Sequence, residues 1–267
     1  MDSLHPNLGR PSWGRRRAIY QLGAAVVGLI AVCWILILVG LLPPTPTDVY
    51  VSAVVLPVLF FPFFAFWDNP GESRTRLEKL SEFSFLWLLI SGVTQTTWEL
   101  PWFFVDAGGH LAGVTADDRW AWLWWAYGGA DTRYITSNPT IAGLEFMAGF
   151  SGLLELYGWY LYRFGKTLPK RIAGCWIALC VCVGLTYLTG SFFVSEWHVG
   201  WAHIHQGAVG FWLKFVGLNL PWLVAPIFCI PAAILELGHL YRAEGRRAAL
   251  AERAGLAAAA PRVRVAA

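Results

Sequence analysis

Residues 83–105 read FSFLWLLISGVTQTTWELPWFFV, an apolar run of the length that crosses a bilayer as a helix. The run contains a carboxylate, Glu99, and a proline, Pro101, placed among tryptophans 98 and 102. A charged side chain is costly inside a membrane, so carboxylates that persist there usually serve a function. The stretch therefore predicts a transmembrane helix that carries a polar site near one end.

The amino-acid composition places the whole chain in the same class. Of its 267 residues, 57% are hydrophobic and 14% are charged, whereas a soluble globular domain carries about 25% charged residues. Tryptophan occurs 16 times, and indole rings favour bilayer interfaces and apolar ligand sites. The net charge of +3 is small, so nucleic acid is not an expected partner. The composition predicts an all-α fold, a polytopic bundle of transmembrane helices surrounded by lipid.

Six apolar runs are long enough to span a membrane, at 21–42, 49–67, 83–105, 140–161, 172–194 and 209–240. The last run contains Pro221, Pro226 and Pro231, which are expected to bend it. Lysine and arginine are concentrated before the first run and after the second, fourth and sixth. With six spans these four segments lie on one side of the membrane. The positive-inside rule therefore predicts that both termini are cytosolic.

Polar side chains in four of these runs are expected at one depth. The rise of a helix places them on the order of 8–18 Å below the outer helix ends. They are Glu99, Glu145, Tyr187, Thr189, Asn219 and, beside them, Trp222. A single polar residue in a span often serves only to hydrogen-bond two helices, whereas two glutamates at one level favour a functional site. The layer therefore predicts an internal polar pocket.

The residue types in this pocket indicate two kinds of chemistry. An apolar environment favours the neutral form of a carboxylic acid, so Glu99 and Glu145 can act as proton donor and acceptor. The rings of Trp98, Trp102 and Trp222 can stabilise a cation, by about 2 kcal/mol or more when desolvated. The set suits either protonation of an alkene to a carbocation or the binding of an ammonium group. Both are redox-neutral, so no cofactor is predicted.

Other polar residues are interpreted as structural. His198, His203 and His205 could suggest a metal, but a His-x-His pair alone is a weak signal, and no metal site is predicted. Glu155 and Glu236 are expected off the polar layer, in the cytosolic halves of their helices. Packing or snorkelling is the expected explanation for both.

Several motifs together resemble the emopamil-binding protein family, also called the EXPERA domain. The segment WWAYGGADTRYITSNPTIAGLEFMAGFSG at 124–152 is similar to a family loop of pattern Y-x-x-x-D-x-R-Y followed by a membrane glutamate. An earlier family helix carries a glutamate followed by a tryptophan, and the last helix carries the order asparagine, tryptophan, proline. The matching residues here are Tyr127, Asp131, Arg133, Tyr134, Glu145, Glu99, Trp102, Asn219, Trp222 and Pro226.

The resemblance implies a membrane-embedded helical fold with a cavity for sterols or amphiphilic amines. The family includes sterol Δ8-Δ7 isomerases, which move a ring double bond by protonation and deprotonation. By position, Glu99 and Glu145 match the acid groups of those enzymes, and Asn219 and Trp222 match residues of the cavity wall. Tyr134 lies on the same loop as Asp131 and Arg133, which we interpret as a structural ion pair that fixes the loop over the site.

The chain departs from the sterol isomerases around the carboxylates. Gln95 stands where those enzymes have a histidine, one turn before the first glutamate, and glutamine cannot shuttle a proton. Leu185 and Thr189 replace a glutamine and an aspartate on the fifth span, and Ala148 replaces a threonine. Gln95 and Thr189 are retained as candidate substrate-binding residues. The departures favour an isoprenoid substrate other than the usual Δ8 sterol, or a cyclisation started by protonation.

The domain prediction follows from the extent of the resemblance, about residues 80–242. Residues 1–20 are expected to form a basic cytosolic segment and residues 21–79 two additional spans. Residues 80–242 form the EXPERA-like four-helix membrane domain. Residues 243–267 are a cytosolic tail rich in alanine and arginine, expected to be a frayed helix and then disordered from Pro261.

Two functions are consistent with the sequence. The first is a cofactor-independent isomerase, or protonation-initiated cyclase, for a sterol or another isoprenoid lipid. The second is a protein that binds or transports sterols or amphiphilic amines in the same cavity without chemistry. Either would reside in the endoplasmic reticulum of a eukaryote or the plasma membrane of a bacterium, with a homodimer as a candidate assembly.

Overall fold

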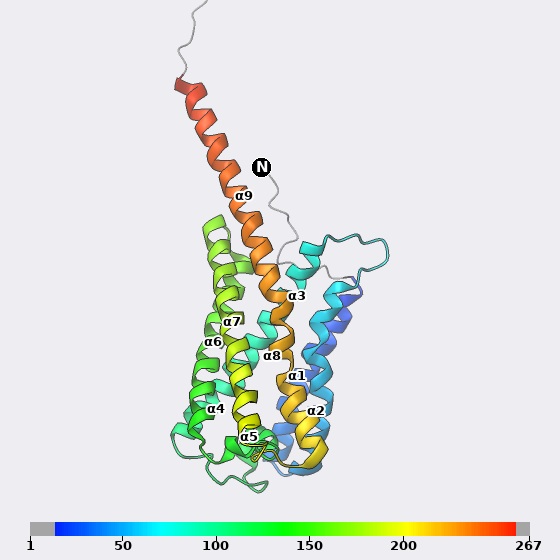
Figure 1. Cartoon of the computed structure of the whole chain (residues 1–267). Helices are drawn as coiled ribbons and strands as arrows, with labels where there is room; N and C mark the ends of the chain where they lie inside the picture. Colours follow the sequence, from blue (N-terminus) through cyan, green and yellow to red (C-terminus); the bar gives the residue numbers. More distant parts are fainter. Residues whose placement is uncertain (1–13, 260–267) are drawn as a thin grey trace, which may run out of the picture.

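The computed structural model describes residues 14–259, with side chains as far as residue 252, and this part of the chain is helical with no strand (Figure 1). The α-helices are α1 (Arg16–Leu38), α2 (Pro44–Leu59), α3 (Arg76–Thr94), α4 (Leu100–Ala107), α5 (Trp122–Gly128), α6 (Pro139–Phe164), α7 (Leu168–His198), α8 (Pro221–Val224) and α9 (Pro226–Ala259). Shorter or wider helical turns are η1 (Phe61–Phe66), η2 (Gln95–Glu99), η3 (Arg119–Ala121), η4 (Thr132–Ile135) and η5 (Val209–Gly217). The all-α prediction is confirmed.

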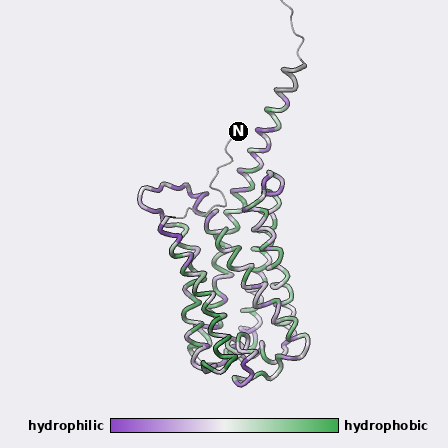
Figure 2. The backbone as a smooth tube through the Cα atoms, turned by 180° about the vertical axis from the view of Figure 1, so that it is seen from behind, coloured by the Kyte–Doolittle hydropathy of each residue, from purple (hydrophilic) through white to green (hydrophobic). Residues whose placement is uncertain are grey.

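Four helical stretches are long and apolar enough to cross a membrane: Arg16–Leu38, Pro44–Phe66, Leu168–His198 and Val209–Glu252. Hydrophobic residues follow the length of the bundle, and hydrophilic residues gather at its ends and along the protruding part of α9 (Figure 2). Large apolar side chains on α1, such as Leu22 and Ile35, are more than half exposed. An apolar outer surface of this kind fits a helix bundle in lipid.

Two further stretches, α3–η2–α4 and α6, run alongside these helices inside the bundle (Figure 1). Both carry buried carboxylates, which lowers their apolar character. Glycines on α6 allow its backbone to approach η2 and the start of α4 closely. A Cβ added at Gly152 would lie 2.7 Å from the Cβ of Gln95, and one at Gly149 would lie 2.9 Å from the Cα of Leu100. The α6 backbone therefore packs directly against η2 and the start of α4.

Pro101 does not end its helix, because the turn before it is widened. Residues Gln95–Glu99 form a π-helix, and the chain continues as α4 to Ala107. Proline lacks an N–H donor and its ring crowds the carbonyl one turn earlier in an α-helix. A π-turn changes which residues face each other and re-aims side chains. Gln95, Trp98 and Glu99 all lie in this widened turn.

The last apolar run is divided by its prolines, as expected. A second π-helix, η5, is followed by the short α8, which begins at Pro221, and by α9, which begins at Pro226. Pro231 lies inside α9. The described part of the tail is a helix that continues α9 to Ala259 and projects beyond the bundle (Figure 1). The predicted disorder from Pro261 falls outside the described residues.

Ion pairs tie the helices together at both ends of the bundle. Near the start of α1, Arg16 contacts Glu82 at 2.9 Å and Glu72 at 2.8 Å; Arg16 and Glu82 are buried, and Glu72 is partly exposed. Near the opposite end, the fully buried Lys214 of η5 contacts Asp48 of α2 at 2.5 Å. These long-range pairs attach α1 and α2 to the rest of the bundle.

Candidate active site

Glu145 is held from the loop that precedes its helix. The Tyr134 hydroxyl donates a hydrogen bond to Oε1 of Glu145, and both side chains are buried. Oε2 of Glu145 is enclosed and has no hydrogen-bond partner. Burial, and next the nearby Glu145 carboxylate, raises the pKa of the Tyr134 hydroxyl well above its usual value, so this tyrosine remains a donor.

Aromatic rings surround Tyr134. The rings of Trp98, Trp102 and Tyr127 lie 5.5, 5.2 and 4.9 Å from the Tyr134 ring, measured between centroids. The Trp102 indole N–H also donates to the Tyr134 carbonyl at 3.1 Å. Asn219 donates to the Tyr127 hydroxyl at 2.7 Å. The structure thus brings five predicted site residues together with Tyr127: Trp98, Trp102, Tyr134, Glu145 and Asn219.

A second group lies deeper along α3. The hydroxyl oxygen of Ser91 accepts hydrogen bonds from Gln95 Nε2 at 3.1 Å and from the Trp222 indole at 3.0 Å. Gln95 is fully buried, and its Oε1 atom has no hydrogen-bond partner. Trp222 also meets the edge of Trp87, with 5.2 Å between ring centroids. Gln95 and Trp222 therefore share Ser91, a residue that the sequence reading did not select.

Glu99 lies between these two groups. Its Oε2 atom is enclosed and has no hydrogen-bond partner. Its carboxyl lies near enough to Glu145 and to Glu155 to be repelled by each of them when they are ionised. We call Glu145, Glu99 and Glu155 the carboxyl row. Like charges this close cannot all be ionised in an apolar interior, so the row is suited to holding and exchanging protons.

Glu155 and Glu236 do not snorkel. Their side chains are 0% and 2% exposed, so neither reaches a membrane surface. Glu155 has no hydrogen-bond partner on either carboxylate oxygen, whereas Glu236 accepts from Tyr162 and Cys175. Of the two expected explanations, snorkelling is wrong and packing remains, because both side chains are turned into the bundle. Glu155 in particular belongs to the carboxyl row.

The loop that precedes α6 and contains η4 is fixed by a buried charge network. Arg133 contacts Asp131 at 2.7 Å and Glu196 at 3.3 Å, and its guanidinium lies 4.6 Å from the centre of the Phe192 ring. Burial raises the pKa of the Asp131 carboxyl, and its hydrogen bond to Arg133 opposes that rise. His203, which is part of the later loop, contacts Glu196 at 2.7 Å. Asp131 and Arg133 thus occupy the structural position expected of them, joined to a third acid at the end of α7.

Two predicted residues on α7 stand apart. Tyr187 is 75% exposed and faces outward, so the structure does not bring it into the polar group. Thr189 is half-buried. Helix α7 is apolar around most of its circumference, and the depth of a residue on such a helix does not reveal which way it faces. For Tyr187 the predicted place in an internal pocket is therefore corrected.

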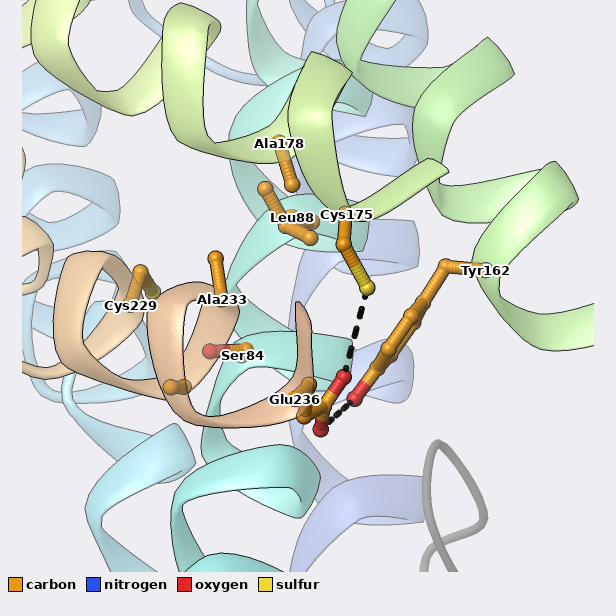
Figure 3. A pocket seen from close by; sticks show the side chains of 9 residues that line it. Ser84, Leu88, Tyr162, Cys175, Ala178, Cys229, Ala233 and Glu236 are labelled. Carbon is orange, nitrogen blue, oxygen red and sulfur yellow. Dashed lines mark hydrogen bonds between the residues drawn. The ribbon is translucent and has the colours of Figure 1, made fainter. Parts of the chain in front are cut away.

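A small cavity lies elsewhere in the bundle, among α3, α6, α7 and α9 (Figure 3). Its polar lining is Ser84, Tyr162, Cys175 and Glu236, and the hydroxyl of Tyr162 also lies 2.5 Å from Ser81. Hydrogen bonds among these residues already occupy Glu236 (Figure 3). We interpret Tyr162, Cys175 and Glu236 as an internal hydrogen-bond network that joins α6, α7 and α9, with the Ser84 hydroxyl beside it and without a partner. Within residues 14–252, no cluster of three or more His, Cys, Asp or Glu side chains is arranged to hold a metal ion.

Comparison with known proteins identifies related sequences. The chain is 32% identical over 151 residues to the 3-beta-hydroxysteroid-Delta(8),Delta(7)-isomerase of Mus musculus, covering 52% of this chain and 64% of that protein. It is 34% identical over 117 residues to the protein of the same name from Rattus norvegicus, covering 43% of this chain and 49% of that protein. The matches thus span about half to two thirds of these relatives. No family model matches the chain, and no solved structure matches it.

Proposed function

We propose that the chain is an intramembrane sterol isomerase of the emopamil-binding protein family, to which its two named relatives connect it. The carboxyl row, beside aromatic rings and inside a bundle of membrane-competent helices, carries the proposal. The two named relatives act on the Δ8 and Δ7 positions of a steroid. The comparisons give no support to the cyclase that the sequence also allowed.

In the proposed reaction, two carboxyl groups of one site exchange protons with the substrate. A protonated carboxyl of the Glu99–Glu145 pair adds its proton to one carbon of the double bond. The carboxylate of the other removes a proton from a neighbouring carbon, and the electrons of that C–H bond form the new double bond. The reaction is redox-neutral and needs no cofactor. General acid–base catalysis of this kind contributes about 10² to 10⁴ in rate.

Residues around the pair have separate roles in the proposal. Tyr134 holds Glu145 in place through its hydroxyl. The rings of Trp98 and Trp102 pack on Tyr134, the partner of Glu145, and Trp222 donates to Ser91. In the proposal, the faces of these rings stabilise the carbocation. Asn219 orients the Tyr127 ring, which packs on Tyr134, through its hydrogen bond to the Tyr127 hydroxyl. Thr189 is proposed to contact the substrate along α7.

The bundle is proposed to cross the membrane six times, with α3–η2–α4 and α6 added to the four apolar helices. This arrangement places Arg16, the loop before α3, the turn before α7 and the protruding part of α9 at one end (Figure 1). These segments carry most of the lysine and arginine, so we assign this end to the cytosol. Residues 80–242 form the catalytic unit in the proposal, and α1 and α2 are an addition to it.

A second function, sterol or amphiphilic-amine binding without chemistry, is favoured by one observation. Enclosed carboxylate oxygens without partners, on Glu99, Glu145 and Glu155, would suit an ammonium group of a ligand. Gln95 also lacks the proton-transfer ability of a histidine. In this alternative the same site holds a lipid and releases it unchanged.

Turnover in deuterated water separates the two functions. The purified full chain, in lipid nanodiscs, is incubated with Δ8 sterols in D₂O, and the products are analysed by mass spectrometry. The isomerase proposal expects a Δ7 product that contains deuterium from the solvent, and its loss in the Glu99→Gln and Glu145→Gln variants. Saturable sterol binding without any deuterated product would instead support the binding function.

A further inference from the structure

Glu155 is a buried carboxyl for which the proposed reaction has no use. It is 0% exposed, and among the described residues no charged group pairs with its carboxyl; its polar neighbour is the Ser91 hydroxyl. Other buried glutamates are partnered: Glu196 contacts Arg133, and Glu236 accepts from Tyr162. Burying an unpaired charge costs several kcal/mol. A glutamate kept in such a place is favoured in its neutral, protonated form, in which it can give up a proton.

The neighbours of Glu155 connect it to the candidate site. Ser91 lies close enough to interact with the Glu155 carboxyl. The Ser91 oxygen already accepts from Gln95 and from Trp222, so both of its lone pairs are used. Its own hydrogen is left to point toward an acceptor such as Glu155. The polar group around Gln95 therefore extends directly to this carboxyl.

The spacing along α6 places Glu99 between the other two carboxyl groups. Glu145 and Glu155 are ten residues apart on one helix, about 15 Å along its axis. Between them, Gly149 packs against Leu100, the residue after Glu99. Glu99 interacts electrostatically with both. The two ends of the row are too far apart for direct proton transfer, and Glu99 is the carboxyl that lies between them.

We propose that Glu155 is a proton-relay residue that recharges Glu99 after each turnover, in the place that Gln95 cannot fill; this rests on the proposed function. Glu99 gives its proton to an alkene carbon and becomes a carboxylate, and Glu145 takes a proton from a neighbouring carbon as the new double bond forms. The O–H bond of Glu155 then breaks, and its proton passes to Glu99. Glu155 regains a proton from water and Glu145 loses one to water when the bundle opens for the sterol. No net proton is gained or lost.

The test uses the full chain in nanodiscs with a Δ8 sterol in H₂O and D₂O. Glu155→Gln has the shape of the protonated acid but cannot transfer a proton. Its kcat is expected to fall by at least about tenfold, less than the 10² to 10⁴ expected for a group that protonates substrate itself. KM should stay within about twofold, because substrate binding is not altered. The solvent isotope effect on kcat should increase, since recharging Glu99 becomes limiting.

Matched variants separate the relay from a structural role. Glu155→Asp keeps a carboxyl and is expected to recover part of kcat, together with a smaller isotope effect. Glu236→Gln changes a buried glutamate that is fully hydrogen-bonded, and it should leave the isotope effect unchanged. A Glu155→Gln variant with the wild-type kcat and isotope effect would overturn the proposal.

A second measurement does not depend on turnover. Infrared spectra of the wild type are compared with those of Glu155→Gln and Glu99→Gln in the C=O region of protonated carboxyl groups. The relay expects Glu155→Gln to remove one band and to displace the Glu99 band, and an undisplaced Glu99 band contradicts the relay. If the wild type turns over no sterol but the displacement is seen, the isomerase proposal fails while proton coupling between Glu155 and Glu99 is supported.

Discussion

At the scale of single residues, the contact between Tyr134 and Glu145 joins the outer loop to the carboxyl row. Tyr134 is the donor, and the second oxygen of Glu145 is already without a partner. Removing the hydroxyl would therefore leave the whole buried carboxyl unpaired. This makes Tyr134 the most informative residue to change outside the carboxyl groups.

Tyr134→Phe is expected to lower the free energy of unfolding by about 1–3 kcal/mol, the usual cost of an unsatisfied buried polar group. Turnover should fall as well, since Glu145 loses its fixed orientation. Both are measured on the purified chain, by thermal unfolding in detergent and by product formation. Tyr157→Phe is the control, because Tyr157 lies on α6, the helix of Glu145, and its side chain is 54% exposed. Equal effects of the two substitutions would mean that the hydrogen bond has no special role.

The sequence could identify Glu99, Glu145 and Tyr134 because each stands in a recognisable motif. It could not identify Glu155, since counting residues along a helix gives the depth of a side chain in the membrane but not the side of the helix on which it lies. The π-turn at η2 places Gln95 against Gly152 of α6, and a widened turn leaves no clear periodic signal. The prediction for Tyr187 was wrong for the same reason. Its depth was counted in the same way, but its side chain faces outward.

At the scale of elements, the crossing of α6 with η2 determines the spacing of the carboxyl row. The two backbones meet at Gly149 and Gly152, where no side chain separates them. The π-turn before Pro101 places Gln95 and Thr96 at this crossing, and Trp98 on the side of η2 that packs on Tyr127 and Tyr134. A proline inside a helical run is expected to disturb the helix, but the sequence could not show that the helix would continue through a wider turn. That outcome depends on tight packing against a different helix.

Gly152→Ala should separate these two elements. The added Cβ would lie 2.7 Å from the Cβ of Gln95, and overpacking of this kind costs about 1–3 kcal/mol. Gly143→Ala is the matched control on the same helix, because an added Cβ there meets nothing within 4 Å. The control should be neutral or stabilise the helix by up to about 1 kcal/mol, through the higher helix propensity of alanine. Thermal unfolding of both variants measures the difference, and equal stabilities would show that the crossing is not tightly packed.

At the scale of the whole molecule, composition and hydropathy were sufficient to predict a helical membrane protein. The number of spans was harder to predict, because α3–η2–α4 and α6 carry the polar residues of the site and are less apolar than the other four. Buried ion pairs such as Lys214–Asp48, which join residues far apart in the chain, leave no sequence pattern at all. The helices that carry the candidate site are thus the least apolar of the six proposed spans.

The proposed topology makes a direct prediction about accessibility. In the six-span arrangement Ser73 and Ala249 lie on the cytosolic side and Ala112 lies on the other, and all three are exposed. Single cysteines at these positions, in sealed vesicles or cells, are treated with a membrane-impermeant maleimide before and after permeabilisation. Ser73→Cys and Ala249→Cys are expected to react only after the cytosolic face is opened, whereas Ala112→Cys should react before.

The parent chain measures background from its own cysteines, of which Cys180 is exposed but lies in the middle of α7. A four-span chain, in which only the apolar helices cross, would place α3–η2–α4 and α6 outside the bilayer, where the carboxyl row would meet water, and Ser73 and Ala112 would then react from the same side.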